Sequence, residues 1–366
     1  MRKNTFSTIC LSTLVSALLS GSCSCAQTVS PTVFNGMSDA SAGAFLSDER
    51  FVVADDENNI LKIYNLSDPS RPAALHDLSA FLRTTFDSPE ADIEGAARVG
   101  DRIYWITSHG RNKDGKERPN RYRFFATDIR NTAGGITIAP AGRPCQEMVP
   151  ALLQASFARD LGLDDATQLG KDLKKKQRER LAPKEEGLNI EALAASPDGQ
   201  TLYIGLRNPR PDHPLTGRPQ AIIIPLTNPR DVIDKAARPR FGEPILWDLG
   251  GHGLRSMDYS PAHKAFFLIA GPHNEGSGCT LYRWSGDRDQ APTPLQTFTK
   301  DGFTPEALIP TADGRLFLLS DDGSRLVKIA HPAECIPGEL VDANTCQNKH
   351  LVDPLKRTFH AVFVKP

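Results

Sequence analysis

One short pattern recurs along the chain: an apolar run that holds a charged residue, then a tight turn, then a second apolar run. Three copies are strong, and in each the turn contains Gly and Asp side by side. The strong copies begin at Ile93-Glu94-Gly95, Ile190-Glu191-Ala192 and Pro305-Glu306-Ala307, and weaker copies begin at Gly43-Ala44-Phe45 and Arg255-Ser256-Met257. Self-similarity at intervals of this kind is typical of repeat architectures.

Each copy predicts two antiparallel strands joined by a hairpin turn, because Gly accepts the positive φ that such turns need. Further β-rich runs follow most copies. The candidates for third strands are residues 60–64, 122–127, 221–226, 279–284 and 326–329, and those for fourth strands are residues 135–139, 244–249, 294–298 and 359–364. Four antiparallel strands per unit predict an all-β fold, a five-bladed β-propeller, with a six-bladed ring as the alternative.

The widest gap between copies has a helical character. Residues 148–186 include Ala151-Leu152-Leu153 and the run Lys174-Lys175-Lys176. We interpret this stretch as a helical insertion on one blade, with the lysines on a solvated helix face. Residues 27–366 are therefore predicted to form a single β-propeller domain, since all-β rings of this length occur as one domain.

The N-terminus has the pattern of a secretory signal peptide. The basic residues Arg2 and Lys3 precede an apolar run, and small residues lead to Ser24-Cys25-Ala26. We expect residues 1–26 to be removed and the mature protein to be periplasmic or secreted. The apolar run is too short for a transmembrane segment, and a lipid anchor on Cys23 or Cys25 is the less favoured interpretation.

Four cysteines follow the expected cleavage site, and an exported chain meets an oxidising compartment. Cys335 and Cys346 flank a loop rich in Pro, Gly and Asn, so we predict a disulfide between them. Cys145 and Cys279 either form a second disulfide or remain free buried thiols, and their spacing does not decide between the two.

The charge balance and the motifs exclude several function classes. The chain has 43 Lys and Arg residues against 44 Asp and Glu residues, with a formal net charge of −1. Without a basic excess to neutralise a phosphate backbone, nucleic acid is not an expected partner. The sequence also lacks the motifs of serine hydrolases, P-loop proteins, dinucleotide-binding folds and HExxH zinc proteases.

Topology predicts that charged residues from distant repeats meet at one end of the channel. In an antiparallel meander, the loop after the second strand lies at the end where the first strand begins. The first strands line the channel of a propeller, so their starts place Glu94, Glu191, Arg255 and Glu306 around one mouth. The neighbouring segments add His109, Arg111, Arg121, Arg207, His252, His273 and Asp321.

This charged mouth has a definite expected chemistry. Carboxylates held together repel one another, which raises their pKa or favours a bound cation. We expect Glu94, Glu191 and Glu306 to be metal ligands, with Ca²⁺ or Mg²⁺ as the cations that oxygen ligands prefer. The same glutamates, with His109 and His273, are the catalytic candidates. The ligand-binding candidates are Arg111, Arg121, Arg207, His252, Arg255 and Asp321, since arginines bind anions through paired hydrogen bonds.

Three functions fit these residues. The favoured one is a binding module for a small anionic or phosphorylated ligand, because no catalytic motif stands out. The others are a metal-assisted phosphoester hydrolase and a scaffold for a protein partner. A purely structural interpretation stands beside them, in which the glutamates and arginines only join neighbouring blades.

Two segments carry a family likeness. Residues 92–126 begin Asp92-Ile93-Glu94-Gly95, and residues 187–209 begin Gly187-Leu188-Asn189. Both resemble a bacterial β-propeller family known as a domain of unknown function, which implies a propeller fold without an established activity. The chain is also distantly similar to phytase-like propellers, in which calcium and carboxylates at the channel handle phosphate esters. Arg255 stands where other repeats have Glu, which departs from an all-carboxylate calcium ring.

Overall fold

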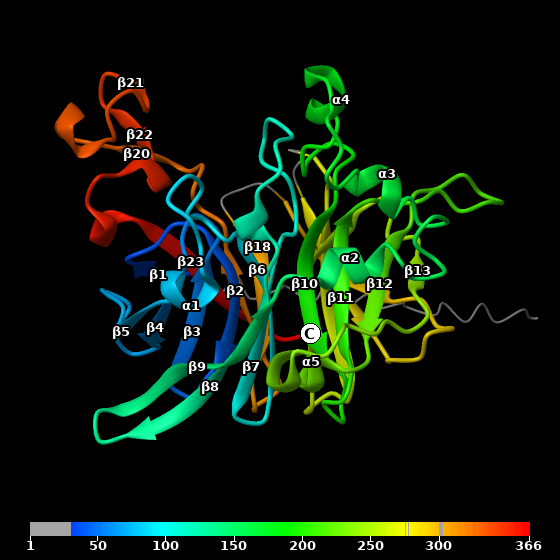
Figure 1. Ribbon diagram of the computed structural model, residues 1–366. Helices are drawn as coiled ribbons and strands as arrows, with labels where there is room; N and C mark the ends of the chain where they lie inside the picture. The colour runs from blue at the N-terminus through cyan, green and yellow to red at the C-terminus, as the bar shows by residue number, and fades with distance from the viewer. Residues whose placement is uncertain (1–30, 275, 277, 300–302) are drawn as a thin grey trace, which may run out of the picture.

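The computed structural model describes residues 31–274, 276, 278–299 and 303–366 (Figure 1). The expected signal peptide and the candidate lipid-anchor cysteines lie outside the described residues. In the described part of the chain, no helix is both long enough and apolar enough to cross a bilayer.

Four of the four-stranded sheets are antiparallel meanders of consecutive strands. The first holds β2 (Ala40–Phe45), β3 (Arg50–Asp55), β4 (Ile60–Asn65) and β5 (Ala74–Asp77). The second holds β6 (Ile93–Val99), β7 (Arg102–Thr107), β8 (Phe124–Thr132) and β9 (Gly135–Cys145). The third holds β10 (Asn189–Ala195), β11 (Leu202–Asn208), β12 (Ala221–Leu226) and β13 (Ile245–Trp247), and the fourth holds β14 (Gly253–Ser260), β15 (Ala265–Gly271), β16 (Cys279–Trp284) and β17 (Thr293–Phe298).

The fifth sheet joins the two ends of the chain. Its order is β18 (Pro305–Pro310), β19 (Leu316–Ser320), β23 (Thr358–Val364) and β1 (Thr32–Asn35), so the outermost strand comes from the N-terminal side. The prediction that residues 326–329 form the third strand of this unit was wrong. β20 (Leu326–Lys328) instead belongs to a small separate sheet with β21 (Leu340–Asp342) and β22 (Thr345–Gln347), because β23 and β1 already complete the fifth sheet.

The innermost strands close into a ring. β2 contacts β6, β6 contacts β10, β10 contacts β14, β14 contacts β18, and β18 returns to β2. The prediction of an all-β propeller is thereby confirmed, and the described residues contain five four-stranded sheets. The predicted hairpin turns are present, with Gly199 at φ +67° and Gly314 at φ +85°, where a side chain would be strained.

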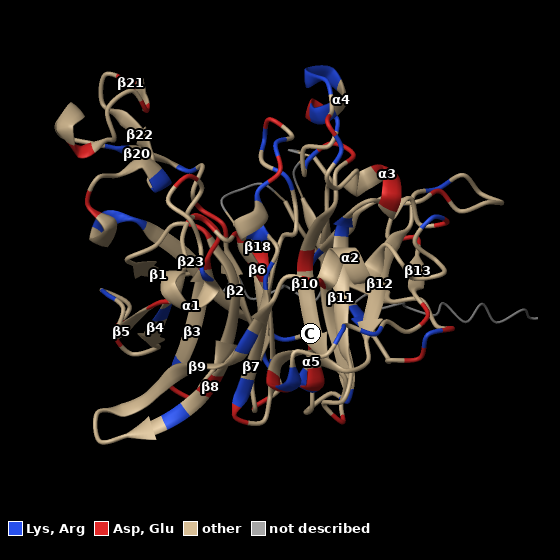
Figure 2. Ribbon diagram, viewed as in Figure 1, with Lys and Arg blue, Asp and Glu red and all other residues tan. Residues whose placement is uncertain are grey.

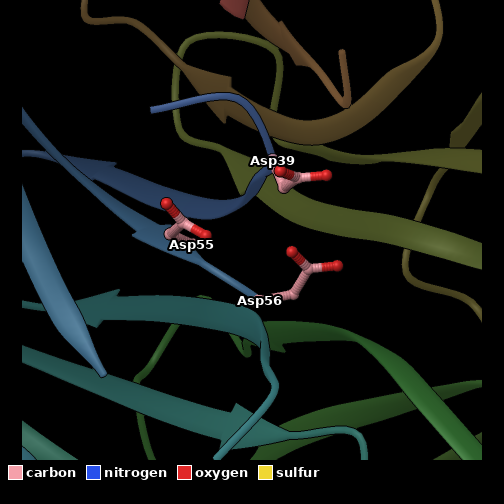
Figure 3. Close-up of side chains that lie close together, drawn as sticks. All are labelled: Asp39, Asp55 and Asp56. Carbon is pink, nitrogen blue, oxygen red and sulfur yellow. The ribbon is translucent and has the colours of Figure 1, made fainter. Parts of the chain in front are cut away.

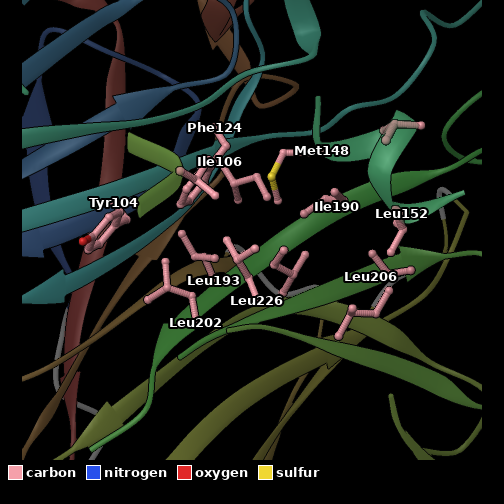
Figure 4. Close-up of a cluster of buried hydrophobic side chains, with 14 of the residues drawn as sticks. Tyr104, Ile106, Phe124, Met148, Leu152, Ile190, Leu193, Leu202, Leu206 and Leu226 are labelled. Atoms are coloured by element: carbon pink, nitrogen blue, oxygen red, sulfur yellow. The ribbon is translucent and has the colours of Figure 1, made fainter. Parts of the chain in front are cut away.

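The core lies between neighbouring sheets, which explains the continuous apolar runs of the second strands. Both faces of β7, β11, β15 and β19 are covered, so these strands are buried along almost their whole length. Between the second and third sheets, Tyr104, Ile106 and Phe124 pack against Leu193 and Leu202 (Figure 4). Each sheet therefore depends on its neighbours for its hydrophobic burial.

Short helices occupy the connections. The stretch between β9 and β10 contains α2 (Met148–Leu152), α3 (Leu163–Thr167) and α4 (Lys175–Glu179), while α1 (Ser79–Leu82) and α5 (Pro229–Lys235) lie elsewhere. Met148 and Leu152 of α2 join the core between the second and third sheets (Figure 4). Single 3₁₀ turns span Pro119–Arg121, Pro332–Glu334, Asn348–His350 and Pro354–Lys356.

The cysteines separate into one bonded pair and two free thiols. Cys335 and Cys346 form the predicted disulfide, with their Cα atoms 5.8 Å apart, and Cys346 lies in β22 of the small sheet. Cys145 and Cys279 remain unbonded. They end β9 of the second sheet and begin β16 of the fourth, so of the two alternatives for this pair, the structure has the free thiols.

Candidate functional site

One residue in each innermost strand stands outside the pairing register with the second strand. These bulge residues are Ser41, Glu94, Glu191, Arg255 and Glu306. A bulge re-aims a side chain and bends the strand locally. The recurring charged position of the sequence pattern is thus one structural position repeated around the ring, near the start of every innermost strand.

The channel below this position is closed. The axial cavity measures only about 10 Å³, room for about one water molecule. Its lining comes from all five innermost strands and includes Gly43, Glu94, Leu193, Ser256 and Leu308. The channel below the mouth therefore has no room for a small organic ligand.

Two of the three predicted metal-binding glutamates are held by arginines. Arg255 Nε lies 3.1 Å from Glu191 Oε2, and Arg255 Nη2 pairs with Glu306 Oε1. Arg207 Nη1 donates to Glu191 Oε1 at 2.7 Å. Burial favours the neutral acid, but the charges of Arg207 and Arg255 together lower the pKa of Glu191 below its ordinary value. We call these four residues the central ion pairs.

Five other carboxylates gather on the first and second sheets. We call them the acidic group: Asp39, Asp55, Asp56, Asp92 and Glu94. Ligand oxygens of Asp39, Asp55 and Asp56 lie within 4.8 Å of one another (Figure 3), and Asp56 forms a second such set with Asp92 and Glu94. Figure 2 shows acidic segments crowded at the end of the ring where β2 and β6 begin, which also carries α3 and α4. Of the predicted metal-binding glutamates, only Glu94 belongs to this group.

The acidic group is poorly neutralised. Burial raises the pKa of Asp56 well above its ordinary value, and the charges of Asp39 and Glu94 raise it further. The pKa values of Asp39 and Glu94 are raised for the same reasons, burial first and neighbouring carboxylates second. The Oδ1 atom of Asp56 is buried without a hydrogen-bond partner. Such an arrangement favours either protonation or a bound cation.

Three cations, Lys62, Arg121 and Lys349, border this group, together with further acids; Lys349 Nζ lies 2.7 Å from Glu57 Oε1, and its charge also acts on Asp39 and Asp56. Lys62 Nζ lies 3.4 Å from Asp55 Oδ2, and Arg121 Nη1 lies 2.8 Å from Asp92 Oδ2. Arg121 also pairs with Glu90. The guanidinium of this predicted ligand-binding residue therefore forms ion pairs with carboxylates of the protein itself. The predicted residue Asp321 is bridged to Asp39 through the backbone, and its charge raises the pKa of Asp39.

The donor set fits a hard divalent cation. Calcium holds six to eight oxygens at about 2.3–2.6 Å, so oxygens on opposite sides of the ion stand about 5 Å apart. The two sets of three carboxylates, with oxygens within 4.8 Å, match that spacing. Within the described residues, neither set includes a His or Cys ligand, which favours Ca²⁺ or Mg²⁺ over softer metals.

Two predicted residues do not belong to this mouth. Arg111 is buried and donates to Thr167 O at 3.0 Å and to Glu117 Oε1 at 2.9 Å, which ties its loop to α3. His109 is 2% exposed, and its Nδ1 lies 2.8 Å from Thr107 O. Burial lowers the pKa of His109 to about 4. The imidazole is therefore enclosed by the protein, and its Nε2 is buried without a hydrogen-bond partner.

The remaining predicted residues lie on the third and fourth sheets. Arg207 contacts Asn274 O at 2.8 Å as well as Glu191, so its terminal nitrogens are used within the protein. His252 and His273 lie on the loops before β14 and after β15. Burial lowers the pKa of both imidazoles, and the charge of Arg210 lowers them further.

Asp55 ends β3, the second strand of the first sheet, and Asp56 follows it in the kind of loop that topology places at this mouth, but they were not among the predicted site residues. Sequence reasoning missed Asp39 and Asp92 because they precede the apolar runs by which the copies were aligned. Each stands two residues before a bulge, Ser41 or Glu94. The signal that could have identified these two residues was an Asp two residues before the bulge position in each of the first two copies.

A further acid, Asp258, gives the fold a pH dependence separate from the mouth. It lies further along β14 than Arg255, and burial raises its pKa to about 8; among the described residues, the Tyr259 N–H is its one hydrogen-bond donor, at 2.7 Å. An unfolded Asp titrates near 4. The folded protein therefore binds the extra proton, and the free energy of unfolding should fall as pH rises from about 4 to about 8.

We expect Asp258→Asn to remove this component, up to a few kcal/mol at about 1.4 kcal/mol per pKa unit. Urea unfolding at pH 4, 6 and 8 measures it. The exposed loop variant Asp289→Asn should keep the wild-type pH profile. Identical profiles for wild type and Asp258→Asn would contradict the assignment.

Comparisons with known proteins give a family and a fold. A family model described as "Protein of unknown function (DUF3616)" matches residues 39–315. The chain is similar to a Thermus thermophilus structure named as a putative oxidoreductase (glucose dehydrogenase), at 14% identity over 91% of this chain and 100% of that one, with a TM-score of 0.42. It is also similar to Myxococcus xanthus glutaminyl cyclase, at 8% identity over 91% and 94% of the two chains, with a TM-score of 0.40. These low identities and TM-scores assign no activity. No curated protein matches the chain.

Proposed function

The chain belongs to the DUF3616 family, and we propose that it binds a divalent cation at the acidic group and, together with that cation, a small anionic or phosphorylated ligand. One observation carries the proposal: Asp56 belongs to both carboxylate sets, and its buried Oδ1 atom has no hydrogen-bond partner. Burying a carboxylate without a partner lowers the stability of the folded protein, and a bound cation would offset this loss of free energy.

The charge distribution supports an anion beside the cation. Arg207 and Arg255 of the third and fourth sheets pair with Glu191, and the charges of Glu191 and Arg255 act on Glu94 of the acidic group. A cation held by carboxylates retains open coordination positions that an oxyanion can fill. We propose that the single domain 27–366 acts in the periplasm or outside the cell, with which the disulfide is compatible.

Calcium binding to Asp56→Asn tests the proposal. We expect the wild type to bind Ca²⁺ and the variant to bind it at least about tenfold more weakly, because a shared charged ligand is lost. Isothermal titration with CaCl₂ and MgCl₂ measures both. Without metal, Asp56→Asn should melt at a higher temperature than the wild type, since it relieves repulsion with Asp39 and Glu94.

The matched control is Asp198→Asn, an exposed acid in a hairpin turn that accepts from Ser196 Oγ and Gln200 N. It should bind Ca²⁺ as the wild type does. No binding of either metal to the wild type at millimolar concentration, or equal affinities for wild type and Asp56→Asn, would remove the cation from the proposal.

Hydrolysis of phosphate esters is the second candidate function, and one observation favours it. Glu90 pairs with Arg121 beside the acidic group, and burial, then the charge of Asp92, raise its pKa to about 7. A carboxylate that titrates near neutral pH suits a general base. Release of phosphate from an ester in the presence of Ca²⁺ or Mg²⁺ separates this function from binding alone.

A further inference from the structure

A cluster of cationic and titratable groups lies on the side of the mouth that the third and fourth sheets form. We call Arg210, His252 and His273 the basic group. Arg210 follows β11, His252 directly precedes β14, and His273 follows β15. Three separate loops therefore supply these side chains, whereas the acidic group comes from the first and second sheets.

Direct contacts bring the three loops together. Arg210 Nη1 donates to the carbonyl of Gly251, the residue before His252. Asn208, the last residue of β11 and two residues before Arg210, donates through Nδ2 to His273 O at 3.5 Å. Arg207 completes the link, since it contacts both Glu191 of the central ion pairs and Asn274 O, next to His273. The basic group is thus fixed at the edge of the central ion pairs.

The basic group keeps unused hydrogen-bonding capacity. Arg210 donates through Nε to Asn208 Oδ1 at 3.2 Å, and no carboxylate of the described residues forms an ion pair with it. The Nδ1 atom of His252 is buried and has no hydrogen-bond partner. Partly buried donors and acceptors of this kind are normally satisfied by a ligand or by water.

The charges around the imidazoles are mostly positive. Arg210 acts on His252, while Arg210, Arg207 and His252 oppose protonation of His273. Among the described residues, Glu185 is the acid that acts on His273, and Asp212 acts on Arg210. An oxyanion between these side chains would reverse this balance and favour the protonated imidazoles. Binding of an anion would then be coupled to proton uptake.

We propose that the basic group is the subsite for a tetrahedral oxyanion, the phosphate or sulfate group of the ligand. This inference rests on the proposed function and assigns the anionic end of the ligand to residues that carry no part of the cation site. The candidate donors come from three separate segments, and several donors suit a tetrahedral group with several free oxygens better than a planar carboxylate.

The test is titration of the whole protein with sulfate, whose charge is constant between pH 6 and 8. We expect the wild type to bind sulfate at least about tenfold more tightly at pH 6 than at pH 8, because each imidazole can gain a proton on binding. Inorganic phosphate should bind at the same site, and acetate should bind much more weakly.

Two variants and a control complete the design. Arg210→Gln should weaken sulfate binding by about tenfold or more, as the loss of a charged donor implies. The double variant His252→Gln/His273→Gln should lose the pH dependence. Arg218→Gln, an exposed arginine paired with Asp248 on the neighbouring loop, should bind as the wild type does.

Calcium titration of Arg210→Gln keeps this inference separate from the proposed function. Unchanged Ca²⁺ binding with lost sulfate binding supports the subsite. Wild-type sulfate binding by Arg210→Gln, an unchanged pH dependence in the double histidine variant, or equal binding of acetate and sulfate would overturn it. If the wild type does not bind Ca²⁺, the cation site is refuted, and the sulfate titrations then decide on the subsite by themselves.

Discussion

Replacing Arg255 by glutamine should lower the free energy of unfolding by about 3–5 kcal/mol, the usual cost of removing one partner from a buried ion pair. Arg255 is in contact with both Glu191 and Glu306, and all three side chains are almost fully buried. Without the guanidinium, Glu306 loses its only ion-pair partner among the described residues. Urea unfolding at pH 7 measures the loss.

Two controls locate the cause of that loss. Arg218→Gln breaks an exposed ion pair with Asp248 and should change stability by less than about 1 kcal/mol. The double variant Arg255→Gln/Glu306→Gln should recover part of the stability, because it removes a buried charge that has no ion-pair partner. If Arg255→Gln unfolds at the wild-type urea concentration, the central ion pairs do not hold the third, fourth and fifth sheets together.

Phe34→Ala should cost about 3–5 kcal/mol, the range for removing a buried aromatic side chain. Phe34 is 1% exposed on β1, and its ring stacks on Phe359 and meets Phe51 edge to face, both with centroids 5.2 Å apart. Those contacts join the N-terminal strand to the fifth sheet and to the first. Losing them weakens the closure of the ring as well as the core.

Val33→Ala is the matched control on the same strand, because its side chain is 42% exposed. It should change stability by less than about 0.5 kcal/mol. Thermal and urea unfolding of both variants measure the difference. Similar losses for Phe34→Ala and Val33→Ala would mean that the β1–β23 pairing itself, and not the aromatic contacts, closes the ring.

The repeat was sufficient to predict the propeller because its signals are local. Alternating apolar runs and Asp-Gly turns depend on neighbouring residues, and the charged position they frame is the bulge at Glu94, Glu191, Arg255 and Glu306. The first copy was aligned at Gly43, although its bulge residue is Ser41. Serine is uncharged, so the first copy lacked the charged residue by which the other copies were aligned.

The closing strand could not be predicted in the same way. β1 pairs with β23 across almost the whole length of the chain, from Thr32 with Ala361 to Asn35 with Thr358. No local pattern in residues 326–329 distinguishes a blade strand from a strand of the small separate sheet. Long-range pairing depends on which edge remains free once the other strands have formed.

The amino-acid sequence alone determined the β-propeller, the disulfide between Cys335 and Cys346, and the meeting of distant charged residues at one mouth. These follow from periodicity, turn chemistry and antiparallel topology, which act over a few residues. Only the tertiary structure decided which charges neutralise one another. Arg255 forms ion pairs with Glu191 and Glu306, while Glu94 lies close to the carboxylates of Asp56 and Asp92. The reason is that Coulomb interactions and burial depend on separations of a few ångströms between side chains from different sheets, and the order of residues along the chain does not encode those separations directly.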